Sequence, residues 1–190
     1  MDEVSSKLLV IFQNVNEWLR FAEAKNAVLL AFAGAGITAT ITLLATAQNL
    51  PSSLRVGLLL TTSLLCVCAL FCSLSFLPKK NLERLLLVQT KAARNSNIEL
   101  KDTDNLYYFG HLYKYNSTQL LDMLNKYYFE ENFSIRYKKE YKDIASQITI
   151  NSEITFLKFK VFTYALYVLI ASIIAIPFSI IISLVVYKTL

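Results

Sequence analysis

Three long runs without a charged side chain constrain the fold of this chain more than any other feature. They cover residues 26–54, 56–78 and 161–187, and Arg55 alone separates the first two. A helix needs about 20 consecutive apolar residues to cross the hydrocarbon core of a bilayer, and each run is long enough. A soluble domain of 190 residues would have too little chain left to cover three such helices. The sequence therefore predicts an all-α membrane protein with three transmembrane helices.

The distribution of Lys and Arg predicts how these helices are oriented. Residues 79–160, between the second and third runs, hold 14 of the 19 basic residues, whereas residues 48–55 hold one. Basic segments beside membrane spans stay in the cytoplasm. We therefore expect residues 79–160 and the amino terminus inside and the carboxyl terminus outside. Acidic side chains among the first 25 residues argue against a cleavable signal peptide.

The patterning divides the chain into four parts. We expect a cytoplasmic amphipathic helix over residues 1–25, a two-span hairpin over 26–78, a cytoplasmic helical sensor region over 79–160 and a third span within 161–190. Because no Gly or Pro precedes Gly34, the first helix is expected to run into the first span. The soluble face is then a small cytoplasmic helical bundle continuous with the spans.

Within the sensor region the sequence indicates three helices and one irregular segment. The expected helices cover residues 81–93, a stretch capped by Asn116 or Ser117 that ends at Tyr128, and a long stretch after Asn132 that merges with the third span. Residues 106–115 are rich in aromatic side chains and contain Gly110, which favours a short strand or an irregular turn.

The composition does not favour catalysis. The chain has one histidine, no Cys/His set with metal-ligand spacing, no phosphate-cradling glycine loop and no nucleophile motif. We expect no catalytic residue, no metal and no cofactor. Three cysteines, Cys66, Cys68 and Cys72, fall within the second span and are interpreted as packing residues. The basic residues flank spans and mix with acids, which suits lipid head groups better than nucleic acid.

Small residues recur every four positions in two of the spans. The first span has Ala27, Ala31, Ala35 and Ala39, and the third has Ala171, Ala175, Ser179 and Ser183. Such stripes allow helix backbones to approach closely. The contact lies either within one subunit or between subunits, and the sequence leaves both open. No ionisable group lies deep in a span, which argues against an ion-coupled transporter.

Two soluble segments are candidates for binding a ligand. Lys25 and Asn26 lie where the first span begins, at a depth where polar groups need partners. The second segment offers aromatic faces for a planar base, a glycine for close backbone approach and donors for an anion; its candidate residues are Tyr108, Phe109, Gly110, His111 and Lys114. The alternatives are an interfacial lysine whose stem lies along apolar surface and a buried corner of the bundle.

Three segments carry a resemblance to a known family. They are residues 17–30 (EWLRFAEAKNAVLL), 108–112 (YFGHL) and 152–160 (SEITFLKFK). In this order, and over nearly the whole chain, they resemble the transmembrane effectors of Pycsar antiphage systems. The resemblance implies a multi-pass protein of the bacterial inner membrane whose partner is the lipid bilayer.

The resemblance also implies a signal and an output. In that family a neighbouring pyrimidine cyclase makes cyclic UMP or cyclic CMP upon infection, and the effector impairs the membrane so that the infection is abortive. The expected function is therefore a non-enzymatic, homo-oligomeric effector that binds cUMP or cCMP. Two alternatives remain: a membrane immune effector driven by another nucleotide or by a protein partner, and a membrane scaffold.

Overall fold

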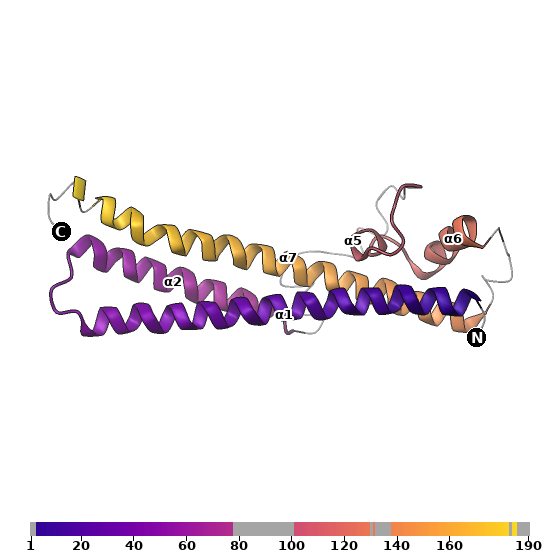
Figure 1. The fold of residues 1–190 in the computed structure, drawn as a ribbon, viewed down its shortest axis with the longest axis horizontal. Helices are drawn as coiled ribbons and strands as arrows, with labels where there is room; N and C mark the ends of the chain where they lie inside the picture. The colour runs from indigo at the N-terminus through magenta and orange to yellow at the C-terminus, as the bar shows by residue number, and fades with distance from the viewer. Residues whose placement is uncertain (1–2, 78–100, 130, 132–137, 183, 186–190) are drawn as a thin grey trace. The chain divides into compact units, whose positions relative to one another are not determined.

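The structure is all-α throughout the part of the chain that it describes. The computed structural model describes residues 3–77, 101–129, 131, 138–182 and 184–185. Its helices are α1 (Glu3–Thr46), α2 (Ser52–Leu74), α5 (Phe109–Leu112), α6 (Ser117–Tyr128) and α7 (Lys139–Ile182) (Figure 1). The predicted fold class is confirmed.

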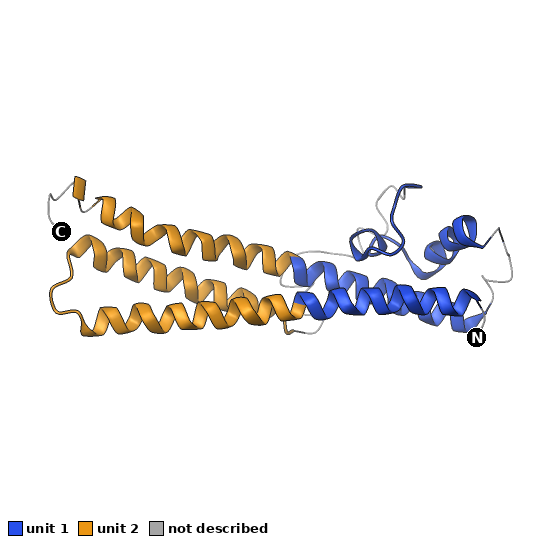
Figure 2. Ribbon diagram, in the orientation of Figure 1, with its two compact units in different colours: residues 1–22, 78–159 blue, residues 23–77, 160–190 orange. Residues whose placement is uncertain are grey.

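The chain forms two compact units. Unit 1 comprises residues 1–22 and 78–159, and unit 2 comprises residues 23–77 and 160–190 (Figure 2). Helices α1 and α7 have 44 residues each and contribute to both units. The first helix therefore continues into the first span, as the absence of an early Gly or Pro predicted.

Helices α1 and α7 run parallel in unit 1. The Ser5 hydroxyl donates a hydrogen bond to Glu140 at 3.1 Å, and the Asn151 amide donates to Asn16 at 2.8 Å. Both pairs join residues that are 135 positions apart, so the register between the helices stays constant over this stretch. The two amides are partly buried and satisfy each other, which favours this register over a shifted one.

Unit 1 has its own hydrophobic core. Helix α6 begins with a complete capping box, in which Asn116 accepts from the Gln119 N–H at 2.8 Å and the Gln119 side chain accepts from the Asn116 N–H at 2.9 Å. This confirms the predicted start of α6. The buried side chains come from α1, the segment around α5, α6 and α7: Val4, Leu8, Ile11, Val15, Leu106, Leu112, Tyr115, Leu120, Leu121, Leu124, Tyr141, Ala145 and Ile148.

One prediction for the sensor region was wrong, and another lies outside the described residues. Residues 109–112 form the short helix α5 instead of a strand or an irregular turn. Burial of Phe109 and Leu112 stabilises that turn, and Gly110 does not adopt a positive φ that would break it. Helix α7 is described from Lys139 onward. The helix expected over residues 81–93 is not among the described residues.

Unit 2 contains the apolar, span-length parts of α1, α2 and α7. All three helices are long and apolar enough to cross a membrane. Cys68 and Cys72 are buried in their shared core, as the packing interpretation predicted, whereas Cys66 is exposed, so the interpretation was wrong for that residue. The spans also share hydrogen bonds: Thr62 donates to the Thr40 hydroxyl at 2.8 Å, and Thr61 donates to the Ser172 carbonyl at 3.3 Å. These contacts join the spans side by side.

The two stripes of small residues differ in how their side chains are buried. In the third span, Ser179 is buried, and a Cβ added to Gly57 of α2 would lie 2.2 Å from the Ser179 hydroxyl oxygen. Ser179 and Ala175 of this stripe therefore pack against Gly57 within one chain, whereas Ala171 is exposed and Ser183 is not among the described residues. The first-span stripe differs, because its four alanines, Ala27, Ala31, Ala35 and Ala39, are all exposed.

Candidate functional site

Unit 1 gathers aromatic rings from α1, α5 and α7 into one cluster. The Trp18 ring centroid lies 6.2 Å from that of Tyr108, 5.5 Å from that of Phe109 and 6.2 Å from that of Phe159. Phe21 joins the cluster at 6.0 Å from Trp18. The structure thus brings together the three segments, 17–30, 108–112 and 152–160, that carried the family resemblance.

The cluster has a closed inner side and an open outer side. Phe109 and Phe159 stack with their rings 12° from parallel and 5.1 Å apart, and Phe109 is 5% exposed. Trp18 and Tyr108 remain 39% and 40% exposed. Their outer faces are available for stacking with a planar ligand or for contact with the membrane interface, where Trp and Tyr are enriched.

The segment before α5 is organised around Asp104. This carboxylate is 4% exposed in its side chain and accepts hydrogen bonds from the Tyr115 hydroxyl at 2.9 Å and the Lys114 ammonium at 3.2 Å. His111 has a similar local role, because its Nδ1 accepts from the Asn105 N–H at 2.8 Å. Lys114 and His111 therefore hold the α5 segment in place, and their predicted contact with a ligand stays a prediction.

The same network shifts two pKa values. Burial alone would raise the pKa of Asp104, but hydrogen bonds from Tyr115, Lys114 and the Lys101 backbone, together with the charge of Lys114, outweigh it and lower the pKa. Burial and then the hydrogen bond to Asp104 raise the pKa of Tyr115. Both shifts favour an ionised Asp104 beside a neutral Tyr115.

We expect unit 1 to lose stability in acid through Asp104. Its pKa is lower in the folded chain than the ordinary value of 3.8, so its contribution is present above pH 3.8 and is lost as the pH falls through the folded pKa. Charge-assisted hydrogen bonds of this kind contribute roughly 1.5–3 kcal/mol. Urea titrations of the detergent-solubilised chain between pH 5 and pH 2 would measure the loss. Asp104→Asn should show a smaller acid-dependent loss; equal losses would contradict the assignment.

Gly110 lies close against the side chain of Tyr108. A Cβ at this position would lie 2.4 Å from the Tyr108 ring. The close approach that the sequence predicted at this glycine is thus made, in this structure, by the Tyr108 side chain.

The remaining two predicted site residues belong to unit 2. The Lys25 ammonium lies 5.3 Å from the centroid of the Phe162 ring, within the range of a cation–π contact. Asn26 is fully buried. The seven predicted residues are therefore divided: Tyr108, Phe109, Gly110, His111 and Lys114 lie in unit 1, and Lys25 and Asn26 lie in unit 2.

Helix α7 buries polar side chains that sequence reasoning did not select. Ser152, Glu153, Thr155 and Lys158 are between 0% and 7% exposed. Ser152 and Thr155 donate to the carbonyls of Ile148 and Asn151 on their own helix. Glu and Lys side chains are rarely this buried in folded proteins unless they are paired. The sequence alone did not indicate that these side chains are buried, because their burial depends on how α7 packs against other helices. Its only signal was that they lie within residues 152–160, a segment that carried the family resemblance.

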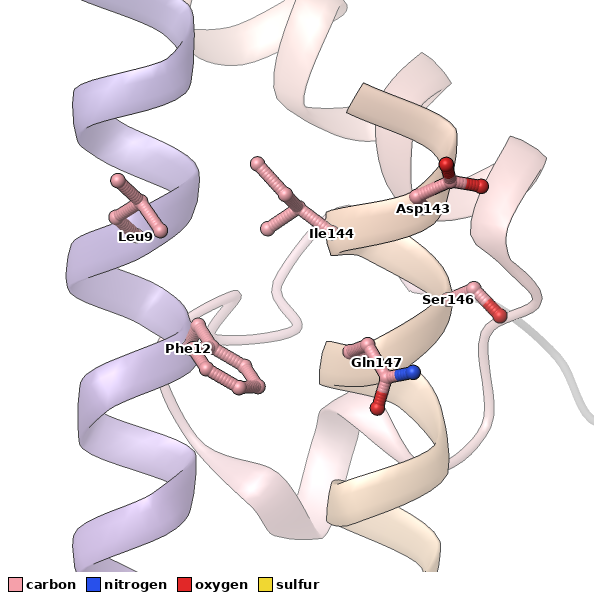
Figure 3. Close-up of a pocket in the computed structure, with 6 residues that line it drawn as sticks. All are labelled: Leu9, Phe12, Asp143, Ile144, Ser146 and Gln147. Carbon is pink, nitrogen blue, oxygen red and sulfur yellow. The ribbon is translucent and has the colours of Figure 1, made fainter. Parts of the chain in front are cut away.

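A groove between α1 and α7 in unit 1 was also missed. It has a volume of about 470 Å³ and is lined by Leu9, Phe12, Asp143, Ile144, Ser146 and Gln147 (Figure 3). Phe12 points from α1 toward α7, Ile144 points back toward α1, and Leu9 lies over α1 in this view (Figure 3). Asp143 and Ser146 lie on the side of α7 farther from α1 (Figure 3). The volume falls in the range of small-molecule sites.

These features define a class of protein. Three span-length helices carry, on extensions of α1 and α7, a helical unit with its own core, and the described residues contain no cluster of side chains that could hold a metal ion. The chain is a helical transmembrane protein with a second helical unit that has its own core. It belongs to the PycTM family: the family model, described as the Pycsar effector protein domain, matches residues 7–186. The chain is thus an antiphage defence effector. No curated protein and no solved structure matches it.

Proposed function

We propose that this effector senses a cyclic pyrimidine nucleotide, cUMP or cCMP, in unit 1 and impairs the bacterial inner membrane in response. The observation that carries the proposal is that α1 and α7 belong both to unit 1 and to the spans. A ligand biases membrane helices only if it binds one helix arrangement better than another. Because the same helices continue into the spans, a change in their arrangement in unit 1 can change the arrangement of the spans.

The proposed orientation places unit 1 in the cytoplasm, with the carboxyl terminus outside. The excess of Lys and Arg in residues 79–160 supports it. In this orientation the unit faces the compartment in which a cyclase releases its product. We propose no enzymatic activity and no cofactor for the chain itself, because the protein has only to bind the signal and rearrange.

We also propose that the effector acts as a homo-oligomer through the first span. Its four exposed alanines lie beside Gly34, where an added Cβ would meet nothing within 4 Å. Such a face lets another span approach closely. Native mass measurement of the detergent-solubilised chain tests this proposal, and a single-chain mass both with and without nucleotide would contradict it.

Co-expression in bacteria tests the proposed signal. We expect growth to stop and a potential-sensitive dye to report depolarisation when the chain is produced together with a pyrimidine nucleotide cyclase. The chain with an adenylate cyclase, and the pyrimidine cyclase without the chain, are the controls. Depolarisation of equal extent with either cyclase, or with the chain alone, would overturn the dependence on a pyrimidine signal.

A further inference from the structure

The groove between α1 and α7 has the chemistry of a site that reads a base. Its apolar part consists of Leu9, Phe12 and Ile144, on which a planar ring can lie. Its polar part comes from α7 alone, where Ser146 and Gln147 follow Asp143 by three and four residues and so lie near it on the helix surface. An apolar floor with a few polar groups at one edge is typical of small-ligand sites.

We propose that this groove binds the pyrimidine ring and that Asp143 makes it prefer cytosine to uracil; the inference rests on the proposed function. A carboxylate only accepts hydrogen bonds, and Asp and Glu characteristically accept from the N4 amino group of cytosine. Uracil presents the O4 carbonyl at that position. Two acceptors would then face each other in a partly desolvated groove, which disfavours uracil.

Gln147 complements Asp143 in this arrangement. Its amide has both a donor and two acceptor lone pairs, so it can pair with the O2 and N3 edge of either pyrimidine. It therefore contributes affinity without selecting a base. Phe12 contributes in the same unselective way, because every base has a face that stacks on an aromatic ring.

A positive charge that could bind a cyclic phosphodiester lies one helical turn before Asp143. Lys139 is exposed and precedes Asp143 by four residues, so both lie on the same side of α7. Lys139 is also the first residue of a 44-residue helix, whose amino-terminal end carries a partial positive charge. A nucleotide with its base at Asp143 and its phosphate toward Lys139 would meet a hydrogen-bond acceptor at the base and positive charge at the phosphate.

Isothermal titration calorimetry on the detergent-solubilised full chain tests the proposal. We expect cCMP to bind about tenfold more tightly than cUMP, the discrimination typical of one well-placed base contact. Asp143→Asn should bring the two affinities close together, because the asparagine amide can accept from N4 of cytosine or donate to O4 of uracil. Lys139→Gln should weaken both nucleotides with little change in their ratio. Glu17→Gln removes one exposed charge from α1 outside the groove and should leave both affinities unchanged.

The outcomes separate this inference from the proposed function. If cCMP and cUMP bind equally, if cUMP binds more tightly, or if Asp143→Asn leaves the ratio unchanged, the assignment of Asp143 is wrong while pyrimidine sensing stands. If neither nucleotide binds the unmodified chain, the proposed function falls together with the inference. Loss of all binding in Asp143→Asn with Trp18 fluorescence unchanged would also overturn base selection by Asp143, because selection predicts that both nucleotides still bind and that only the preference is lost.

Discussion

Leu8→Ala is expected to lower the free energy of unfolding of unit 1 by about 2–5 kcal/mol, the cost of a large cavity in a packed core. Leu8 is fully buried among core residues from α1, α6 and α7. The chain has one tryptophan, Trp18, which lies in the aromatic cluster of unit 1. Its fluorescence during a urea titration of the solubilised chain therefore measures the unfolding of this unit without a label.

Val10→Ala is the matched control for this prediction. Val10 lies two residues away on the same helix but is 50% exposed, so its truncation leaves no internal cavity. We expect a change of less than about 0.5 kcal/mol. If the two variants lost equal stability, or if Leu8→Ala left the urea midpoint unchanged, the described core of unit 1 would be wrong.

Gly57→Ala is expected to destabilise the contact between α2 and α7 by about 1–3 kcal/mol, because it overpacks a close approach. The added Cβ would lie 2.5 Å from the Ser179 Cβ, an atom that moves only with the backbone of α7. Gly34→Ala is the control, because its Cβ would meet nothing within 4 Å. Alanine is the better helix former, so this control should be neutral or slightly stabilising within a single chain.

Thiol labelling measures the separation of the spans. Cys66 is exposed, whereas Cys68 and Cys72 are buried in the core of unit 2. In detergent, mass spectrometry after maleimide treatment should count the buried thiols as they become reactive on heating. Gly57→Ala should lower that temperature, and Ser179→Gly in the same chain should restore part of it. An unchanged temperature in Gly57→Ala would contradict the close approach.

The spans and the long helices could be predicted because they depend on local patterns. Uncharged runs of 20 or more residues, and the absence of Gly or Pro before Gly34, are properties of consecutive residues. The cap of α6 at Asn116 is equally local. The short helix α5 was missed because burial of Phe109 and Leu112, a tertiary effect, decides its conformation.

The candidate site was predicted only in part for the same reason. Tyr108 and Phe109 lie beside Trp18, but their neighbours reach them from α1 and α7, at positions that depend on the register of those helices. The groove at Asp143 requires that register as well. A surface acid in a charged stretch carries no signal of its own until α1 packs beside α7 and completes the groove that Asp143 lines.

The central claim is that a pyrimidine nucleotide on the side of unit 1 makes this protein permeabilise a bilayer. Dye release from vesicles that contain the purified full chain tests it most directly, with cCMP, cUMP, cAMP or cGMP added outside vesicles in which unit 1 faces outward. We expect release with a cyclic pyrimidine nucleotide, retention with both purine nucleotides and retention in protein-free vesicles. Retention with every nucleotide, or equal release without any, would contradict it.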